Sequence, residues 1–147
     1  MGRGSLFCLA TLAGLAAWPA QALEYRSVTA PAILYDAPST QAHKLYIIAR
    51  QTPVEVVVSV DKWVKIRDQG GGLTWIERAN LSDHRTIQVI ASRAAVRQKP
   101  EEAAPLAFEV GKDVVLEVVE PAVAGWIKVR HRDGLAGYIR VTDVWGA

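Results

Sequence analysis

The clearest pattern in the chain is an alternation of apolar and charged residues in two five-residue segments, 63–67 (WVKIR) and 126–130 (WIKVR). Successive side chains of an extended strand point to opposite faces, so this alternation predicts strands with one apolar and one charged face. A valine-rich run precedes each segment, at 54–60 and 114–119, and its β-branched residues also favour a strand. The pattern therefore predicts two similar groups of β-strands.

A cluster of turn-forming residues follows each alternating segment and indicates a hairpin. The clusters are DQGGG at 68–72 and HRDG at 131–134, and each leads into a further β-prone segment. Glycine and aspartate supply the positive φ angles that a tight turn needs. We therefore expect two hairpins that begin at Trp63 and Trp126.

The two groups of strands are copies of one unit. Residues 63–81 recur without a gap at 126–144, with five identical residues in nineteen positions. A repeat of this length indicates a repeated structural unit. We expect a first domain at 23–85 and a second at 86–147. No flexible linker lies between them, and domains this small bury little surface alone, so the two are expected to contact each other.

The chain is predicted to be all-β. No window keeps the i, i+3, i+4 apolar spacing of an amphipathic helix, and only the short stretches 78–83 and 141–145 suit a single helical turn. Five or so short strands per unit that cannot bury two faces separately are expected to close into a small barrel. The expected fold is two tandem small barrels.

Residues 1–22 have the pattern of an export signal. Arg3 precedes an apolar run at 6–18, and the run ends in the small-x-small sequence Ala20-Gln21-Ala22. This pattern predicts a signal peptide cleaved near Ala22, and a mature chain that is periplasmic or secreted. No later stretch is apolar over ~18 residues, so we expect no membrane insertion after cleavage. Cys8 lies too early in the apolar run for a lipid anchor.

The composition of the mature chain argues against several classes of function. Residues 23–147 contain no cysteine and carry a net charge close to zero. A disulfide framework, a thiolate metal site and a cysteine hydrolase are therefore excluded, and no basic surface for nucleic acid is expected. The histidines are isolated, and no serine has a nucleophile-elbow context. We expect no metal, no cofactor and no enzymatic activity.

The ordered pattern of these segments resembles the bacterial SH3 domain. The matching pattern is Leu34, Pro38, the strand 54–60, the segment 63–67, then Gly71, Trp75-Ile76 and Leu81, and it recurs from Val96 to Val144. The resemblance implies SH3-like barrels and a non-enzymatic binding module that acts on peptidoglycan or on cell-wall enzymes. Unit one departs from the pattern at Gln51, where a glycine usually stands, and we expect no attached hydrolase domain.

Aromatic residues are the first candidates for a binding site. Tyr35 lies in the motif Ala32-Ile33-Leu34-Tyr35-Asp36, which is similar to the peptide-binding signature of eukaryotic relatives, where a tyrosine and a strand-opening tryptophan line a groove. Tyr35 and Trp63 are the equivalents, and Trp126 opens the matching strand of unit two. The alternative interpretation is structural, since a tryptophan that covers a barrel end stabilises it by several kcal/mol.

Basic residues on the same strands are the second candidates. Lys65, Arg67, Lys128 and Arg130 alternate with apolar neighbours, so we expect them on the outer face. They either keep the surface soluble or contact the carboxylates of wall peptides or an acidic partner. The sequence thus favours a periplasmic module that binds peptidoglycan, with a protein–protein adaptor of an envelope protein or cell-wall enzyme as the alternative.

Overall fold

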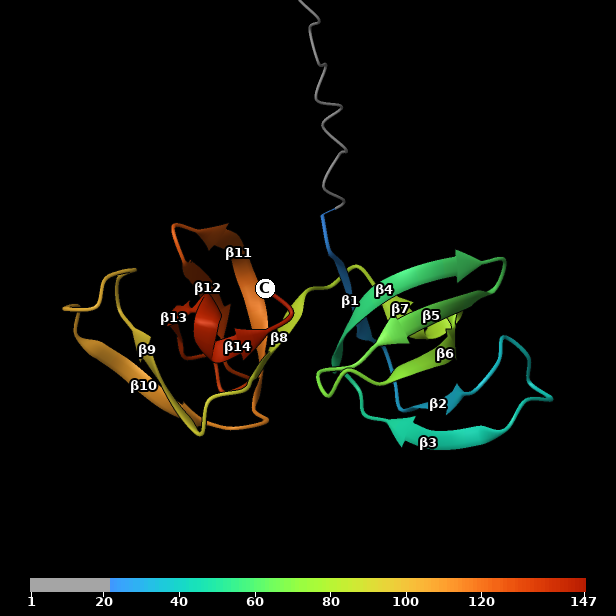
Figure 1. Cartoon of the computed structure of the whole chain (residues 1–147). Coiled ribbons are helices and arrows are strands. Elements are labelled where there is room, and N and C mark those ends of the chain that lie inside the picture. The colour runs from blue at the N-terminus through green and yellow to red at the C-terminus, as the bar shows by residue number, and fades with distance from the viewer. Residues whose placement is uncertain (1–21) are drawn as a thin grey trace, which may run out of the picture.

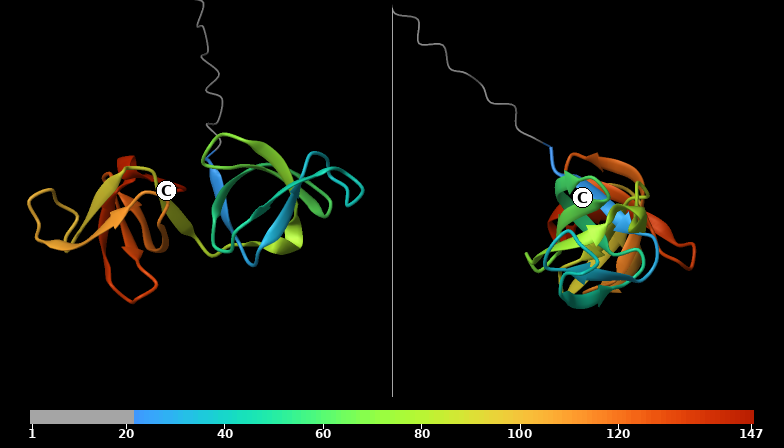
Figure 2. Two further views of the ribbon diagram at one scale, coloured as in Figure 1. Left: turned by 90° about the horizontal axis from the view of Figure 1, so that it is seen from below. Right: turned by 90° about the vertical axis from the view of Figure 1, so that its right-hand side faces the viewer.

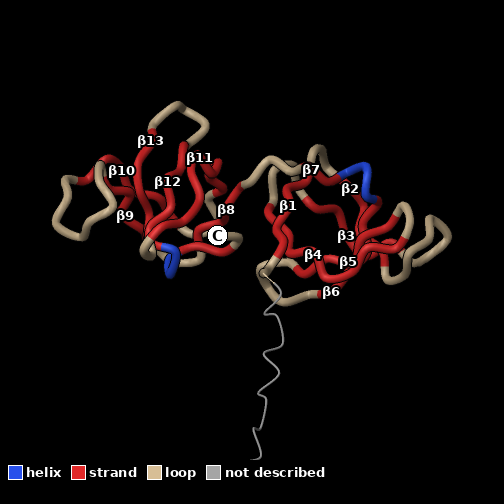
Figure 3. Tube along the Cα trace, turned by 90° about the horizontal axis from the view of Figure 1, so that it is seen from above, coloured by secondary structure: helices blue, strands red, loops and turns tan. Residues whose placement is uncertain are grey.

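The computed structural model describes residues 22–147. The expected signal peptide, apart from its last residue, lies outside the described residues. The chain forms two antiparallel sheets of seven strands each, with two short 3-10 turns (Figures 1 and 3). The all-β prediction is therefore confirmed. Among the described residues, no helix is long and apolar enough to cross a membrane.

The first sheet contains the strands β1 to β7 in the order β3-β2-β6-β5-β4-β1-β7. Their bounds are β1 (Glu24–Val28), β2 (Ala32–Tyr35), β3 (Lys44–Ile48), β4 (Pro53–Val60), β5 (Trp63–Arg67), β6 (Leu73–Glu77) and β7 (Leu81–Ser82), with the 3-10 turn η1 at Arg78–Asn80.

The second sheet repeats this order as β10-β9-β13-β12-β11-β8-β14. Its elements are β8 (Thr86–Val89), β9 (Arg93–Arg97), β10 (Leu106–Gly111), β11 (Val115–Val123), β12 (Trp126–Arg130), β13 (Ala136–Arg140), η2 (Val141–Asp143) and β14 (Val144–Trp145). The identical strand order confirms the tandem repeat that the sequence indicates.

The predicted hairpins are the β5–β6 and β12–β13 pairs. Gly71 has a φ of +88° and Gly134 a φ of +94°, so both turns use the left-handed backbone that glycine adopts at little cost. In the second turn the Leu135 N–H donates to Asp133 Oδ1 at 3.0 Å and lowers the pKa of that carboxyl group. The helical turns η1 and η2 follow the hairpins, as expected from the sequence.

The closed barrel expected from the sequence is not observed. Each sheet curls around one core, but β3 pairs only with β2, and β7 pairs only with β1. The strand β7 has two residues and is too short to provide a ladder to the opposite edge. Each domain is therefore a strongly curved open sheet (Figure 2).

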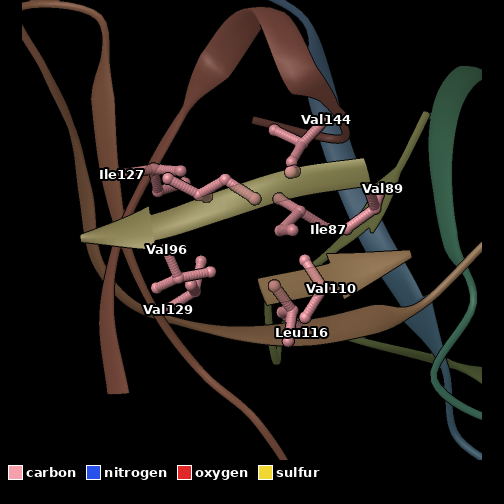
Figure 4. Close-up of a cluster of buried hydrophobic side chains, with 10 residues drawn as sticks. Ile87, Val89, Val96, Val110, Leu116, Ile127, Val129 and Val144 are labelled. Carbon is pink, nitrogen blue, oxygen red and sulfur yellow. The ribbon is translucent and has the colours of Figure 1, made fainter. Parts of the chain in front are cut away.

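Alternation of buried and exposed positions gives each sheet its core. The β5 pattern places Val64 and Ile66 inside and leaves Trp63, Lys65 and Arg67 on the outer face. Each domain has its own apolar cluster of branched aliphatic residues, and Figure 4 shows that of the second domain around Ile87 and Leu116. Burial of these side chains is the main stabilising contribution in a chain without disulfides.

The two domains touch near their shared connection. The Tyr25 and Trp145 rings meet edge to face with centroids 5.2 Å apart, and the Arg85 guanidinium lies over Tyr25. Arg85 Nη2 donates to the Gly146 carbonyl at 2.6 Å, and Thr86 Oγ1 donates to the Gln51 carbonyl at 2.7 Å. Elements far apart in sequence thus lie side by side where the sheets meet (Figure 1).

Candidate functional site

Cross-strand register assembles the candidate residues of the first domain on the outer face of its sheet. Tyr35 lies opposite Trp75, Trp75 opposite Lys65, and Lys65 opposite Val58. Residues directly opposite in an antiparallel pair share one face, so these four side chains form a row across β2, β6, β5 and β4. We call this set the first-domain row.

Aromatic contacts organise the first-domain row and its neighbour Trp63. The Tyr35 and Trp63 rings meet edge to face, with centroids 5.3 Å apart at 90°. Tyr35 is only 5% exposed, so the ring supports its neighbours and offers little surface of its own. Trp63 and Trp75 are half-buried. Edge-to-face geometry fixes the orientation of the Trp63 ring, and the exposed parts of the two tryptophans offer apolar surface.

Lys65 supplies a positive charge beside this aromatic surface. Its ammonium lies 5.9 Å from the centroid of the Trp75 ring, a cation–π distance. Within residues 22–147, Lys65 makes no ion pair. Its neighbour on β4 is Val58, which is 44% exposed and carries no charge. The Lys65 charge is therefore free to meet a ligand.

Arg67 has an internal partner. Its Nη1 lies 3.1 Å from Glu55 Oε2, and the Glu55 residue is only 8% exposed. A buried carboxylate needs a compensating donor, so Arg67 serves the fold of the first domain. The second domain repeats this pair as Arg130 and Glu117, at 2.9 Å.

The equivalent row of the second domain contains Arg97, Tyr138, Lys128 and Glu120, from β9, β13, β12 and β11. We call this set the second-domain row. Lys128 donates to Glu120 Oε1 at 2.9 Å, and this hydrogen bond raises the pKa of Lys128. Arg97 takes the place of Tyr35 and donates to the Ala104 carbonyl at 3.2 Å. The charges on β12 are thus matched internally.

Trp126 is covered by a cation. The Arg140 guanidinium lies 5.1 Å from the Trp126 ring centroid, and Glu102 pairs with Arg140 from the loop between β9 and β10. In the first domain, Glu77 stands opposite Trp63 where Arg140 stands opposite Trp126. The two strand-opening tryptophans therefore have cross-strand neighbours of opposite charge.

The match to known proteins decides the family. The model of the bacterial SH3 domain matches residues 28–83 and 91–146, one match for each sheet. The chain belongs to the bacterial SH3 domain family. Bacterial SH3 domains thus account for both repeats, and the resemblance of the segments at Trp63 and Trp126 is confirmed.

Solved structures that resemble these tandem bacterial SH3 domains are longer proteins. NlpC2 from Trichomonas vaginalis shares 15% identity and a TM-score of 0.39, over 86% of this chain and 49% of that chain. NlpC1 from the same organism shares 15% identity and a TM-score of 0.38, over 92% of this chain and 50% of that chain. An NlpC/P60 family protein from Bacillus cereus shares 14% identity and a TM-score of 0.37, over 83% of this chain and 56% of that chain. The chain spans about half the length of each. No curated protein matches it.

Several residues that shape these two bacterial SH3 faces are absent from the sequence-predicted site. Trp75 and Tyr138 carry the cation–π contacts of the two lysines. Val58 and Glu120 determine whether the neighbouring lysine is free or paired, and Arg140 covers part of Trp126. Aligning the β4 and β11 strands of the two repeats would have suggested the Val58 and Glu120 difference, but their pairing with the lysines depends on bulges in both strands.

Proposed function

We propose that this protein is a non-catalytic binding module of the bacterial periplasm that recognises the peptide part of peptidoglycan. The observation that carries the proposal is the outer face around Trp63, where half-buried aromatic rings flank the free ammonium of Lys65. Membership of the bacterial SH3 family supports a binding role in the cell wall. The signal pattern of residues 1–22 supports export.

The chemistry of this face fits a short peptide that carries acidic groups. Rigid tryptophan rings offer apolar area at low conformational-entropy cost, and an ammonium group pairs with a carboxylate. Wall peptides combine short aliphatic side chains with carboxylates, so both parts of the face have a counterpart. Among residues 22–147, no group of three His, Cys, Asp or Glu side chains could hold a metal ion, and the proposed role needs none.

Sedimentation with purified intact peptidoglycan tests the proposal. The chain from Leu23 to Ala147 contains every described strand and is the protein to use. We expect the wild type to pellet with the wall and Trp63→Ala to remain in the supernatant while it keeps a cooperative urea-unfolding transition. Trp63→Phe, which keeps an aromatic ring and the packing on Tyr35, should retain most of the binding. A wild type that stays in the supernatant at tens of micromolar in low salt would refute wall binding.

A second candidate function, a protein–protein adaptor, has its own observation. The strand β3 lies at the edge of the first sheet, and Leu45, Tyr46 and Ile47 are 47%, 48% and 70% exposed. An exposed apolar edge strand can pair with an extended segment of another protein. Under this alternative, an envelope protein should copurify with the wild type and be lost from Ile47→Lys, whose charge protects the edge.

A further inference from the structure

We infer that the first domain alone carries the wall-binding site and that Lys65 pairs there with a carboxylate of the wall peptide. The inference rests on the proposed function and adds to it which domain binds and which ligand group is recognised. It is drawn from differences between the two copies of one fold, which have the same strand order and equivalent rows of side chains.

The first difference is the residue on β4 or β11 that stands beside the lysine. Val58 lies opposite Lys65, whereas Glu120 lies opposite Lys128 and accepts its hydrogen bond at 2.9 Å. A ligand carboxylate that approaches Lys128 must displace Glu120 and gains little net interaction. A carboxylate that approaches Lys65 meets an ammonium group whose neighbour on β4 is apolar. Charge complementarity therefore favours the first domain.

The second difference is the surroundings of the tryptophan and of the position that Tyr35 occupies. Arg140 covers Trp126 and is itself paired with Glu102, so part of the tryptophan face is already in use. Arg97 replaces Tyr35 and is tied to the loop carbonyl of Ala104. In the first domain an aromatic ring occupies this position and contacts Trp63. Apolar surface and a free charge thus coincide only in the first-domain row.

Among the described residues, neither of the two carboxylates nearest to Lys65 on this face pairs with it. Glu55 pairs with Arg67, which lies two residues beyond Lys65 on the same face of β5. Glu77 lies opposite Trp63 and makes no ion pair with Lys65. The sequence change that would close the site is therefore a carboxylate at position 58, which is where the second domain has one.

A substitution beside Lys65 tests the inference while Lys65 and the aromatic rings stay in place. Val58→Glu should weaken binding of the 23–147 chain to intact peptidoglycan about tenfold, because the new carboxylate pairs with Lys65. Val58→Gln introduces a side chain with nearly the shape of glutamate but without its charge, and it should bind within about twofold of the wild type. An equal loss of binding in the two variants would show a steric effect and overturn the inference that the Lys65 charge pairs with a ligand carboxylate.

Matched variants of the two domains locate the site. Lys65→Ala should weaken binding about tenfold, while Lys128→Ala and Arg97→Ala should bind like the wild type. Peptidoglycan whose carboxyl groups have been amidated should bind the wild type about as weakly as untreated wall binds Lys65→Ala. Equal losses in Lys65→Ala and Lys128→Ala, or unchanged binding to the amidated wall, would overturn the inference while wall binding itself stands. No pelleting of the wild type would instead refute the proposed function.

Discussion

At the residue scale, one ion pair occurs in both domains but in different surroundings. Arg67 pairs with Glu55, whose side chain is 11% exposed, and Arg130 pairs with Glu117, whose side chain is 33% exposed. A carboxylate that is largely removed from water depends on its partner, whereas an accessible one can be hydrated instead. The same pair should therefore contribute more to the stability of the first domain.

The arginine variants test this difference. Arg67→Ala should lower the free energy of unfolding by about 1–3 kcal/mol, because it leaves Glu55 without its compensating charge. Arg130→Ala should cost less than about 1 kcal/mol, as expected for an exposed pair. Urea unfolding followed by tryptophan fluorescence measures both. Similar costs would mean that Glu55 reaches water when Arg67 is removed.

The sequence predicts the outer-face position of these arginines but not their partners. Alternation along β5 is visible in the letters of residues 63–67. The pairing of Arg67 with Glu55 depends on the register of β4, which shifts between Val56 and Val58. A bulge moves every later residue to a new cross-strand neighbour, and no local pattern in the sequence marks it.

At the element scale, the approach of β13 to β9 depends on one glycine. A Cβ atom at Gly137 would lie 2.6 Å from the Arg97 carbonyl oxygen and 2.8 Å from Val96 Cγ1. The equivalent residue of the first domain is Thr74, opposite Ile66 as Gly137 is opposite Val129. The two copies of the fold therefore differ in how closely these strands pack.

Two glycine variants separate close packing from backbone conformation. Gly137→Ala should destabilise the second domain by about 2 kcal/mol or more, because backbone atoms must move apart. Gly134→Ala has open space around its Cβ and a φ of +94°, so it should cost about 1 kcal/mol from conformation alone. Thermal unfolding of both variants shows which one is less stable. A smaller loss of stability in Gly137→Ala than in Gly134→Ala would contradict the close packing of β13 on β9.

Edge strands are the elements that the sequence predicts least well. The strands β3 and β10 lie in stretches for which the sequence pattern predicts no element. In β3 the first four residues are exposed on both faces, so no alternation of apolar and polar residues develops. Central strands bury one face, so their sequences alternate between apolar and polar residues. An edge strand is defined instead by its hydrogen bonds to one neighbour.

At the scale of the whole molecule, the contact between the domains joins the first strand of the chain to the last. Trp145 from β14 packs on Tyr25 from β1, and Gly146 approaches Pro53 so closely that a Cβ would lie 3.1 Å from the proline Cβ. The side chains of Arg85 and Thr86 add hydrogen bonds across the same contact. The contact that the sequence predicts for such small domains is therefore present.

Removing the aromatic contact should separate the unfolding of the two domains. We expect the wild type to unfold in one calorimetric transition, because each small domain gains stability from the other. Trp145→Ala should produce two transitions, with the second domain unfolding first because it also loses the packing of β14. A single transition in both proteins, or two in both, would contradict the coupling.

Tyr25 should make the contact sensitive to alkaline pH. Burial raises the pKa of the Tyr25 phenol above its ordinary value of 10.0, and the Glu55 charge acts in the same direction. The folded state thus favours the neutral phenol, so its stabilising contribution is complete below pH 10 and is lost as pH rises through the folded pKa. Between pH 9 and 11, the wild type should lose more stability than Tyr25→Phe in urea unfolding. Equal losses would show that Tyr25 ionises without hindrance.

The indole N–H signals of the 23–147 chain show whether the aromatic face of the first domain binds the wall peptide. The four tryptophans of this chain are Trp63, Trp75, Trp126 and Trp145. Titration with a soluble peptidoglycan fragment that carries its stem peptide should shift the Trp63 and Trp75 signals and leave those of Trp126 and Trp145 in place. Shifts at Trp126 or Trp145 alone, or no shift at millimolar fragment, would contradict binding of the wall peptide at the aromatic face of the first domain.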